Sequence, residues 1–500
     1  MFAAAALSYQ MSLSLNKTNA SSHSNTGTLL LTQNRDLESF QHFENAMSVD
    51  PISRCAYMNM GVAYLSIGQL NNAAKLLKES SGSFESFYNL AVLEQRNGNL
   101  NEALKFIELA MGECRCTSHH QVAITLFGFL KASMCDWSDF DPIIVHTTWC
   151  TARGQPSQSQ LENKFIKRLE NVKKIRIGYV LPTHSVGNAF NDIHCVHDPS
   201  VFDVFPYFID THAHVRNIAP QIAQDRIHIL VYVTKLLPGA SYERLAPIQI
   251  SLNESDYDMM DYIVSSQEHS YIHTKSLVVP GVYHNIANDQ FDGNSNANKD
   301  DLRSRYGISD DIFVYGCFQA PQAISSQLFD VWMNILKETE DNTCILLVRH
   351  NDQMEVNLKT EAEKTGVDPD RLIFVDHASH LDHLKRYSMI DLYLDSCIRS
   401  GRTAICEALL SGSPAICIQG ESPETCYGAN ILSHVALDGL VVKSLEEYKN
   451  LAITLQSDEE KFIEIIRKLD DKTMFPKKQW VHCYEKGLQS LIELNLIHTG

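Results

Sequence analysis

The stretch at residues 391–430, DLYLDSCIRSGRTAICEALLSGSPAICIQGESPETCYGAN, constrains the fold of this chain more than any other. Its apolar run Leu392–Leu394 has the length of a short buried strand and ends at an acidic residue. A polar turn follows, and Thr403–Leu410 has the small and apolar side chains of a packed helix, which a glycine and a proline end. Ala415–Ile418 then predicts a second strand. The order strand, loop, helix, strand is the unit from which doubly wound parallel sheets are built.

The loop at residues 396–401 lies where such units bind phosphate groups. It follows the carboxyl end of a strand and precedes a helix, so backbone N–H groups and the helix dipole converge on it. Glu407 comes one turn inside the helix, where its carboxylate can accept hydrogen bonds from the hydroxyl groups of a sugar that carries the phosphate. An ordinary helix start with a solvated glutamate gives the same pattern, so the two interpretations stand as alternatives.

Composition indicates a soluble chain with several domains. Its 500 residues correspond to about three domains, and 44% hydrophobic and 20% charged residues are typical of globular proteins. The net charge of −18 excludes a general electrostatic attraction to nucleic acid or an anionic membrane. No stretch approaches the roughly 18 apolar residues of a membrane span, and residues 1–15 lack the basic leader of a signal peptide. The 13 scattered cysteines predict reduced thiols in the cytoplasm or nucleus.

The amino-terminal part predicts a flexible tail at residues 1–35 and helical repeats at residues 36–150. The tail is rich in Ser, Asn and Thr toward its end. Beyond it, the small residues Gly61 and Ala73 recur as small residues 30 positions later, where two helices would cross. This spacing resembles tetratricopeptide repeats, which bind protein partners. We favour repeats over a generic helical bundle because the small-residue positions coincide.

Four residues near the end of the repeats have the side chains of metal ligands: Cys114, Cys116, His119 and His120. Zinc sites of the usual kind separate two pairs of ligands by a long loop. The four residues here are too crowded for that arrangement. Their spacing favours a loop between helices, and we predict no metal site.

Two parallel-sheet α/β domains are predicted after the repeats, at residues 170–290 and 301–500. The expected strands of the first are Lys173–Leu181, Val201–Ile209, Arg226–Val233 and Asp261–Val264. Those of the second are Phe313–Cys317, Cys344–Val348, Leu372–Val375, Leu392–Leu394, Ala415–Ile418 and Leu440–Val442. Helical segments fit between the strands, and ligands of such sheets bind at the carboxyl edges. The end of the chain, Asp458–Leu496, predicts amphipathic helices that return to brace the first sheet.

The motifs CDWSDFD, KIRIGYV, RIHILVYV, APIQ, MDYI, SGRTAICEALLSGSP, GES, GANIL and MFPKKQW follow the repeats in this order. Together with the repeats they resemble the O-linked N-acetylglucosamine transferase family, including its plant SPINDLY-like branch. The resemblance implies an all-α tetratricopeptide-repeat segment followed by two Rossmann-like domains in the GT-B arrangement. It also implies a UDP-sugar donor, most simply UDP-GlcNAc, and inverting transfer to Ser or Thr of acceptor proteins. Neither a metal nor a permanently bound cofactor is implied.

The resemblance assigns the nucleotide to residues of the second sheet domain. Ala378 matches the residue whose backbone meets the uracil, and His383 and Arg386 match the pair that follows it. Thr403 matches the hydroxyl near the diphosphate, and Glu407 matches the carboxylate on the ribose. These five positions form the predicted donor site.

The resemblance assigns the chemistry to His228 and Arg402. His228 matches a family histidine that faces the cleft, although by itself a histidine in a strand is more often a core residue. The family lysine that neutralises the departing diphosphate aligns with Ala323, and a glycine-rich loop is shortened at Ser251–Tyr257. Loss of such a cation typically costs about 3–4 kcal/mol in the barrier. Arg402 would lie beside the same diphosphate, where it either restores part of that charge or blocks the sugar.

Two functions therefore stand as alternatives. The first is an O-GlcNAc transferase-like protein O-glycosyltransferase whose activity is weak or altered. The second is a catalytically inactive family member that binds proteins through its repeats and regulates an active glycosyltransferase, in a homo- or hetero-oligomer. The persistence of the nucleotide-side residues favours the first, and the missing lysine favours the second.

Overall fold

The computed structural model describes residues 2–32, 35–114, 116–138, 172–183, 190, 192–209, 218–233, 244–252, 260–265, 275–279, 299–339, 342–469 and 477–497. The chain divides into two compact units, a helical one built on residues 1–131 and an α/β one that contains residues 218–500. The joints between the predicted domains, residues 151–169 and 291–300, lie outside the described residues except for residues 299 and 300. None of the helices in the described part of the chain is long and apolar enough to cross a membrane.

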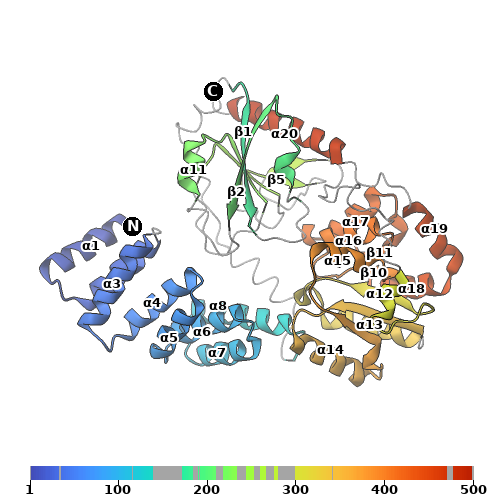
Figure 1. Ribbon diagram of the computed structural model, residues 1–500, viewed down its shortest axis with the longest axis horizontal. Coiled ribbons are helices and arrows are strands. Elements are labelled where there is room, and N and C mark those ends of the chain that lie inside the picture. Colours follow the sequence, from blue (N-terminus) through green and yellow to red (C-terminus); the bar gives the residue numbers. More distant parts are fainter. Residues whose placement is uncertain are drawn as a thin grey trace. The chain divides into compact units, whose positions relative to one another are not determined.

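The helical unit consists of successive antiparallel helices (Figure 1). They are α1 (Phe2–Leu15), α2 (Ala20–Thr32), α3 (Asp36–Val49), α4 (Arg54–Ser66), α5 (Leu70–Glu79), α6 (Phe84–Arg96), α7 (Leu100–Gly112) and α8 (Thr117–Ser133). Gly61 packs so closely on α5 that a Cβ there would come within 2.9 Å of Leu77. Gly68 and Gly98 end α4 and α6 with φ of +77° and +79°, a backbone conformation that favours glycine. The predicted tetratricopeptide-like repeat is therefore confirmed.

The flexible tail predicted for residues 1–35 is wrong, because α1 and α2 are helices. Small side chains let α2 approach its neighbours, and Gly27 lies directly against the buried ring of Phe43 on α3. Polar residues of α2 are hydrogen-bonded rather than solvated, since Ser24 accepts a bond of 2.9 Å from Asn59 of α4. A composition rich in Ser and Thr here reflects close helix packing and not disorder.

The first sheet is parallel and has the strand order β2-β1-β3-β4-β5-β6. Its strands are β1 (Ile175–Pro182), β2 (Phe202–Ile209), β3 (Ile229–Tyr232), β4 (Ile248–Ser251), β5 (Tyr262–Ser265) and β6 (Lys275–Val278). A short helix, α11 (Ala219–Gln224), precedes β3. The sequence did not indicate β4 and β6, which are four residues each.

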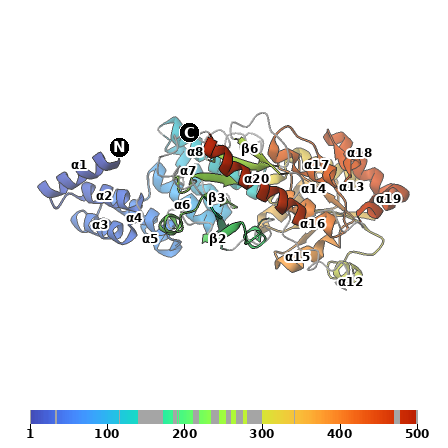
Figure 2. The ribbon, with the colours of Figure 1, turned by 90° about the horizontal axis from the view of Figure 1, so that it is seen from above.

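The last helix, α20 (Lys477–Ile497), packs on the first sheet, as predicted (Figures 1 and 2). The same prediction is wrong for residues 459–469, because Ile465 and Leu469 pack in the core of the second sheet. Its side chains Trp480, Tyr484 and Leu488 share one hydrophobic cluster with residues of β1 and β3. A buried polar contact adds to this packing, because Glu485 lies 3.1 Å from the ring of His197. Chain segments almost 300 positions apart therefore complete one core.

The second sheet is also parallel, with the order β12-β11-β10-β7-β8-β9. Its strands are β7 (Phe313–Cys317), β8 (Thr343–Val348), β9 (Leu372–Val375), β10 (Leu392–Leu394), β11 (Ala415–Ile418) and β12 (Val441–Val442). Its helices are α12 (Lys299–Ser304), α13 (Ser326–Glu338), α14 (Asp352–Thr365), α15 (His380–Tyr387), α16 (Arg402–Leu410), α17 (Pro423–His434), α18 (Leu445–Ser457) and α19 (Glu459–Leu469). The six predicted strands of this domain are all present, within one residue at each end.

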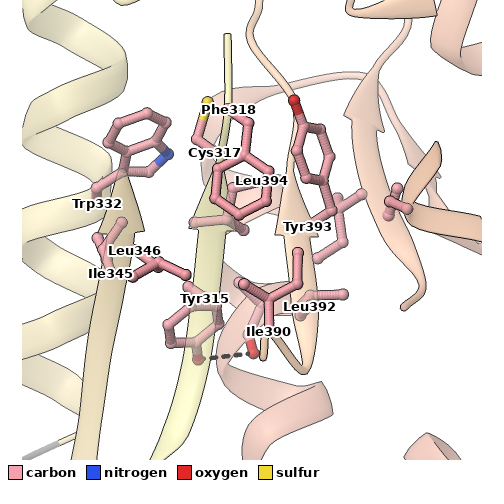
Figure 3. Packing of buried hydrophobic residues seen from close by; sticks show 14 of the residues in the cluster. Tyr315, Cys317, Phe318, Trp332, Ile345, Leu346, Ile390, Leu392, Tyr393 and Leu394 are labelled. Atoms are coloured by element: carbon pink, nitrogen blue, oxygen red, sulfur yellow. Dashed lines mark hydrogen bonds between the residues drawn. The ribbon is translucent and has the colours of Figure 1, made fainter. Parts of the chain in front are cut away.

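Large buried side chains from adjacent strands fill the core of the second sheet (Figure 3). Tyr315 of β7 is fully buried, and its hydroxyl donates a hydrogen bond of 3.1 Å to the carbonyl of Ala452 on α18. Phe318 follows the carboxyl end of β7 and lies near the ring of Tyr393 from β10 (Figure 3). Aromatic side chains thus lie directly beneath the carboxyl edge of the sheet, where a ligand is expected.

Candidate functional site

The strand order of the second sheet reverses between β7 and β10, and ligands of open α/β sheets bind at such a reversal. The loops after these two strands leave the sheet side by side. Gln319, in the loop after β7, donates a hydrogen bond of 2.5 Å to Asp395, in the loop after β10. The structure thus joins at one point two loops that are 76 positions apart in the sequence.

Asp395 organises the loop between β10 and α16. It is fully buried and also accepts hydrogen bonds from the Ser400 hydroxyl at 2.6 Å and the Gly401 N–H at 2.8 Å. Burial raises the pKa of Asp395 to about 7, while these donors act in the opposite direction. Ser400 accepts a further hydrogen bond of 2.7 Å from the Gly428 N–H of α17. The loop is therefore held from both sides.

The amino end of α16 presents free hydrogen-bond donors. Asp395 takes the Gly401 N–H, but the N–H groups of Thr403 and Ala404 have no hydrogen-bond partner in the described part of the chain. The first turn carries no acidic side chain. Unpaired N–H groups and the positive end of the helix dipole attract anions. This end of α16 is suited to a phosphate group.

Glu407 is buried on the same helix with one carboxylate oxygen unused. Its side chain is only 3% exposed, which rules out the alternative of a solvated glutamate. The Tyr387 hydroxyl donates a hydrogen bond of 3.0 Å to Oε2, whereas Oε1 has no hydrogen-bond partner among the described residues. His380 and His383 lie 4.0 and 3.9 Å from the two oxygens. Burial raises the pKa of Glu407 to about 7, and the Tyr387 hydrogen bond opposes this rise.

Helix α15 brings the predicted base-binding residues next to Glu407. Burial, with a smaller contribution from Arg386, lowers the pKa of His383 to about 4, so its imidazole is neutral at pH 7. Arg386 is buried, and its Nη1 has no hydrogen-bond partner among the described residues. Ala378 is exposed in the loop between β9 and α15. Polar groups from both helices therefore line one corner of the carboxyl edge.

Arg402, the first residue of α16, rests on aromatic rings. Its guanidinium lies 4.6 Å from the ring centre of Phe190 and 5.9 Å from that of Tyr427. Such cation–π contacts contribute about 0.5–2 kcal/mol. In the described residues no carboxylate forms a salt bridge with Arg402. Its charge is held near the amino end of α16 without being neutralised.

The cleft position expected for His228 does not agree with the structure. This residue is buried directly before β3, and its Nδ1 accepts a hydrogen bond of 3.0 Å from the N–H of Arg176. Its own N–H donates to the carbonyl of Arg176 at 2.8 Å. Both residues lie at the amino ends of their strands, whereas ligands bind at the carboxyl ends. The geometry is that of a hydrogen-bonded core histidine.

The loop after β7 carries no cation where the resemblance places a lysine. Ala323 ends a 3₁₀ turn, Pro321–Ala323, and its side chain is buried. The turn packs against the preceding segment of the chain, since Gln322 donates a hydrogen bond of 2.7 Å to Ser133. Residues 253–257 of the shortened loop lie outside the described residues.

Sequence reasoning missed the residues that hold the site together: Gln319, His380, Tyr387 and Asp395. Asp395 could have been found, because an acid directly after a strand of a parallel sheet lies at the carboxyl edge. Tyr387 and His380 gave no signal. Their roles depend on the crossing of α15 with α16, which places Tyr387 against a residue 20 positions away.

Comparisons with known proteins agree with this architecture. Residues 286–484 match the sequence model of glycosyl transferase family 41. The chain is 28% identical over 368 residues to the probable UDP-N-acetylglucosamine–peptide N-acetylglucosaminyltransferase SEC of Arabidopsis thaliana, covering 64% of this chain and 37% of that protein. It is 27% identical over 187 residues to the Caenorhabditis elegans UDP-N-acetylglucosamine–peptide N-acetylglucosaminyltransferase, covering 37% of this chain and 16% of that protein.

A solved structure shares the fold over almost the whole chain. It is a mutant O-GlcNAc transferase from Thermobaculum terrenum, with a TM-score of 0.63 at 18% sequence identity. The match covers 96% of this chain and 98% of that one. At this identity the likeness establishes a common fold: a helical repeat segment followed by two parallel α/β domains in the GT-B arrangement.

Proposed function

We propose that this chain, whose residues 286–484 match glycosyl transferase family 41 and which is similar to O-GlcNAc transferases, binds a UDP-sugar and transfers the sugar to Ser or Thr of a protein. The donor would bind at the carboxyl edge of the second sheet. The observation that carries the proposal is the free Oε1 of buried Glu407, one turn from the unpaired N–H groups of Thr403 and Ala404. A ribose hydroxyl and a diphosphate fit these two features.

Each part of the nucleotide has a proposed partner. The N–H groups at the start of α16 and the Thr403 hydroxyl would bind the diphosphate, and Glu407 the ribose. The uracil would lie over the loop at Ala378, beside His383 and Arg386. The pKa of His383, lowered to about 4, supports an uncharged ring that can stack on or hydrogen-bond to a neutral base. We propose no role in binding or catalysis for His228.

Sugar transfer requires stabilisation of the departing UDP. As the acceptor hydroxyl oxygen bonds to the anomeric carbon and its proton passes to water, the bond to the β-phosphate oxygen breaks and negative charge grows on the diphosphate. In this proposal, the amino end of α16 and the Arg402 guanidinium would stabilise that charge. No metal or resident cofactor enters this proposal. With Ala323 in place of a lysine, we expect turnover lower by roughly two to three powers of ten than with a complete set of donors.

The second candidate function is an inactive protein-binding partner of a related glycosyltransferase. Two observations favour it: Ala323 supplies no charge, and the Arg402 guanidinium is engaged with Phe190. In that case the repeats would bind proteins, in a homo- or hetero-oligomer, without any transfer. For either function we propose a cytoplasmic or nuclear location, since the scattered cysteines include no disulfide among the described residues.

Calorimetric titration with UDP tests the proposed donor site. We expect saturable UDP binding by the wild type. In Glu407→Gln the dissociation constant for UDP should rise roughly tenfold or more, because one charged hydrogen-bond acceptor is lost. Glu421→Gln is the matched control, since Glu421 is exposed. Absence of any UDP binding by the folded wild-type protein would contradict the proposal.

Incubation with radiolabelled UDP-GlcNAc and a cell lysate separates the two functions. Label in lysate proteins that decreases in the Arg402→Ala variant supports weak transfer. UDP binding without label supports the inactive partner. A clear rise in label with Ala323→Lys, in a variant that circular dichroism shows to be folded, would count against complete inactivity.

A further inference from the structure

Tyr387 donates a hydrogen bond to the buried side chain of Glu407, although no sequence pattern links the two residues. It is the last residue of α15 and is fully buried. Its ring packs 4.8 Å from Phe318 and 6.0 Å from Tyr393, measured between ring centres. These rings restrict rotation of the phenol. Its hydroxyl therefore stays where it donates a 3.0 Å hydrogen bond to Oε2 of Glu407.

The other groups around the Glu407 carboxylate are weaker partners. His380 and His383 lie 4.0 and 3.9 Å away, beyond hydrogen-bond distance. Burial lowers the pKa of both imidazoles, so neither is a fixed cation at pH 7. The Cys406 thiol is buried beside Glu407, and burial raises its pKa to about 12, which keeps it uncharged. Among the described residues, Tyr387 supplies the carboxylate's one hydrogen bond.

We propose that Tyr387 is a positioning residue for nucleotide binding. Its hydrogen bond to Oε2 of Glu407 keeps the carboxylate ionised and leaves Oε1 facing a ribose hydroxyl. The inference rests on the proposed function and adds to it the residue that prepares the carboxylate. A buried carboxylate with no donor would take up a proton and lose its strength as an acceptor. The Tyr387 hydrogen bond opposes that proton uptake and leaves the second oxygen for the ligand.

The test compares Tyr387→Phe with Tyr393→Phe. Both variants remove one buried hydroxyl from the same aromatic cluster, but among the described residues only the Tyr387 hydroxyl donates a hydrogen bond to Glu407. UDP binding is measured by calorimetry across the pH range around 7. UDP analogues that lack the 2′- or the 3′-hydroxyl are measured alongside.

We expect Tyr387→Phe to weaken UDP binding roughly ten- to hundredfold at neutral pH. Binding in the wild type should decline as pH falls through the Glu407 pKa, and in this variant the decline should begin at higher pH by about one unit. The penalty for removing one ribose hydroxyl should be large in the wild type and small in Tyr387→Phe. Tyr393→Phe should match the wild type in both respects. Equal effects of the two variants, or an unchanged pH profile in Tyr387→Phe, would overturn the proposal.

An infrared titration without ligand tests the effect of Tyr387 on the protonation of Glu407 independently of UDP binding. The carbonyl band of the protonated Glu407 carboxyl is identified as the band that Glu407→Gln removes. Its midpoint should lie near pH 7 in the wild type, higher in Tyr387→Phe and unchanged in Tyr393→Phe. If this shift occurs but the wild type binds no UDP, the donor site is wrong and Tyr387 still controls Glu407. If the midpoint does not shift, the positioning role is wrong whatever the protein binds.

Discussion

At the residue scale, two buried carboxylates dominate the candidate site and differ in how they are satisfied. Asp395 accepts hydrogen bonds from Gln319, Ser400 and the N–H of Gly401, so groups of the protein itself satisfy both of its carboxylate oxygens. Among the described residues, Glu407 has a single hydrogen-bond donor and one oxygen without a hydrogen-bond partner. A fully satisfied buried acid stabilises a loop, whereas a half-satisfied one is costly unless a ligand completes it. The second case indicates a binding group.

Glu407 therefore carries a stability cost that depends on pH. Burial raises its pKa from the ordinary value of 4.5 to about 7, so the folded state binds a proton more tightly than the unfolded state does. Its contribution to stability is most favourable below pH 4.5 and is lost as pH rises through about 7. The shift corresponds to about 3 kcal/mol.

The Glu407→Gln variant lacks this titration, so we expect its stability relative to the wild type to increase with pH. The difference in free energy of unfolding should grow by up to about 3 kcal/mol between about pH 4.5 and pH 8. Urea denaturation at both pH values measures it. The exposed Glu421→Gln variant should show no such trend. A difference that is constant with pH would mean that Glu407 is not protonated in the folded state at neutral pH.

At the element scale, the position of α16 depends on its contact with α17. Gly428 lies in the middle of α17, where a glycine is normally unfavourable. A Cβ at this position would come within 2.7 Å of Ile405 and of the Ser400 hydroxyl, and within 2.8 Å of Cys417. The glycine thus lets α17 approach both the loop and the first turns of α16.

We expect Gly428→Ala to destabilise the α/β unit by about 1–3 kcal/mol, because overpacking outweighs the better helix propensity of alanine. UDP binding should weaken as well, since the clash falls on the loop that presents Thr403. Thermal unfolding and calorimetry measure the two effects. Gly439→Ala is the matched control, because nothing lies within 4 Å of a Cβ at that position. Equal stability of the two variants would show that the close approach is not required.

At the scale of the whole molecule, the first sheet is completed by the last helix of the chain. Leu488, Tyr484 and Trp480 of α20 are buried against β1 and β3. The Glu485 carboxylate accepts a hydrogen bond of 2.8 Å from the N–H of Asp198 and lies 3.1 Å from Nδ1 of His197, and these contacts fix the helix at one point. The core of the first sheet domain therefore depends on side chains of α20.

Leu488→Ala should lower the free energy of unfolding by about 2–5 kcal/mol, as cavity-forming substitutions in cores do. Leu381→Ala, at a leucine that is 61% exposed on α15, should have little effect. Chemical denaturation followed by far-ultraviolet circular dichroism measures both. Tolerance of Leu488→Ala would indicate that α20 contributes little to the core of the first sheet.

The sequence by itself determined the α/β class, the six strands of the second sheet and the helix that begins beside residue 402. The pattern of apolar residues and the positions of glycine and proline suffice to predict these elements. Fully buried strands are apolar throughout, and the helices between them have glycine or proline near their ends. The residue order also placed Thr403 and Glu407 one turn apart on one helix. The resemblance of the motifs indicated a likeness to O-GlcNAc transferases, whereas the sequence did not indicate the strands β4 and β6.

Only the tertiary structure decided which side chains can act. His228 and Glu407 are both buried polar residues, yet the direction of the strands puts the first at the amino edge and the second beneath the carboxyl edge. Pairing of Tyr387 with Glu407, and of Gln319 with Asp395, depends on a helix crossing and on the order of strands in the sheet. A hydrogen bond requires two atoms to lie about 3 Å apart. The positions of two residues in the sequence do not show whether the fold brings them that close.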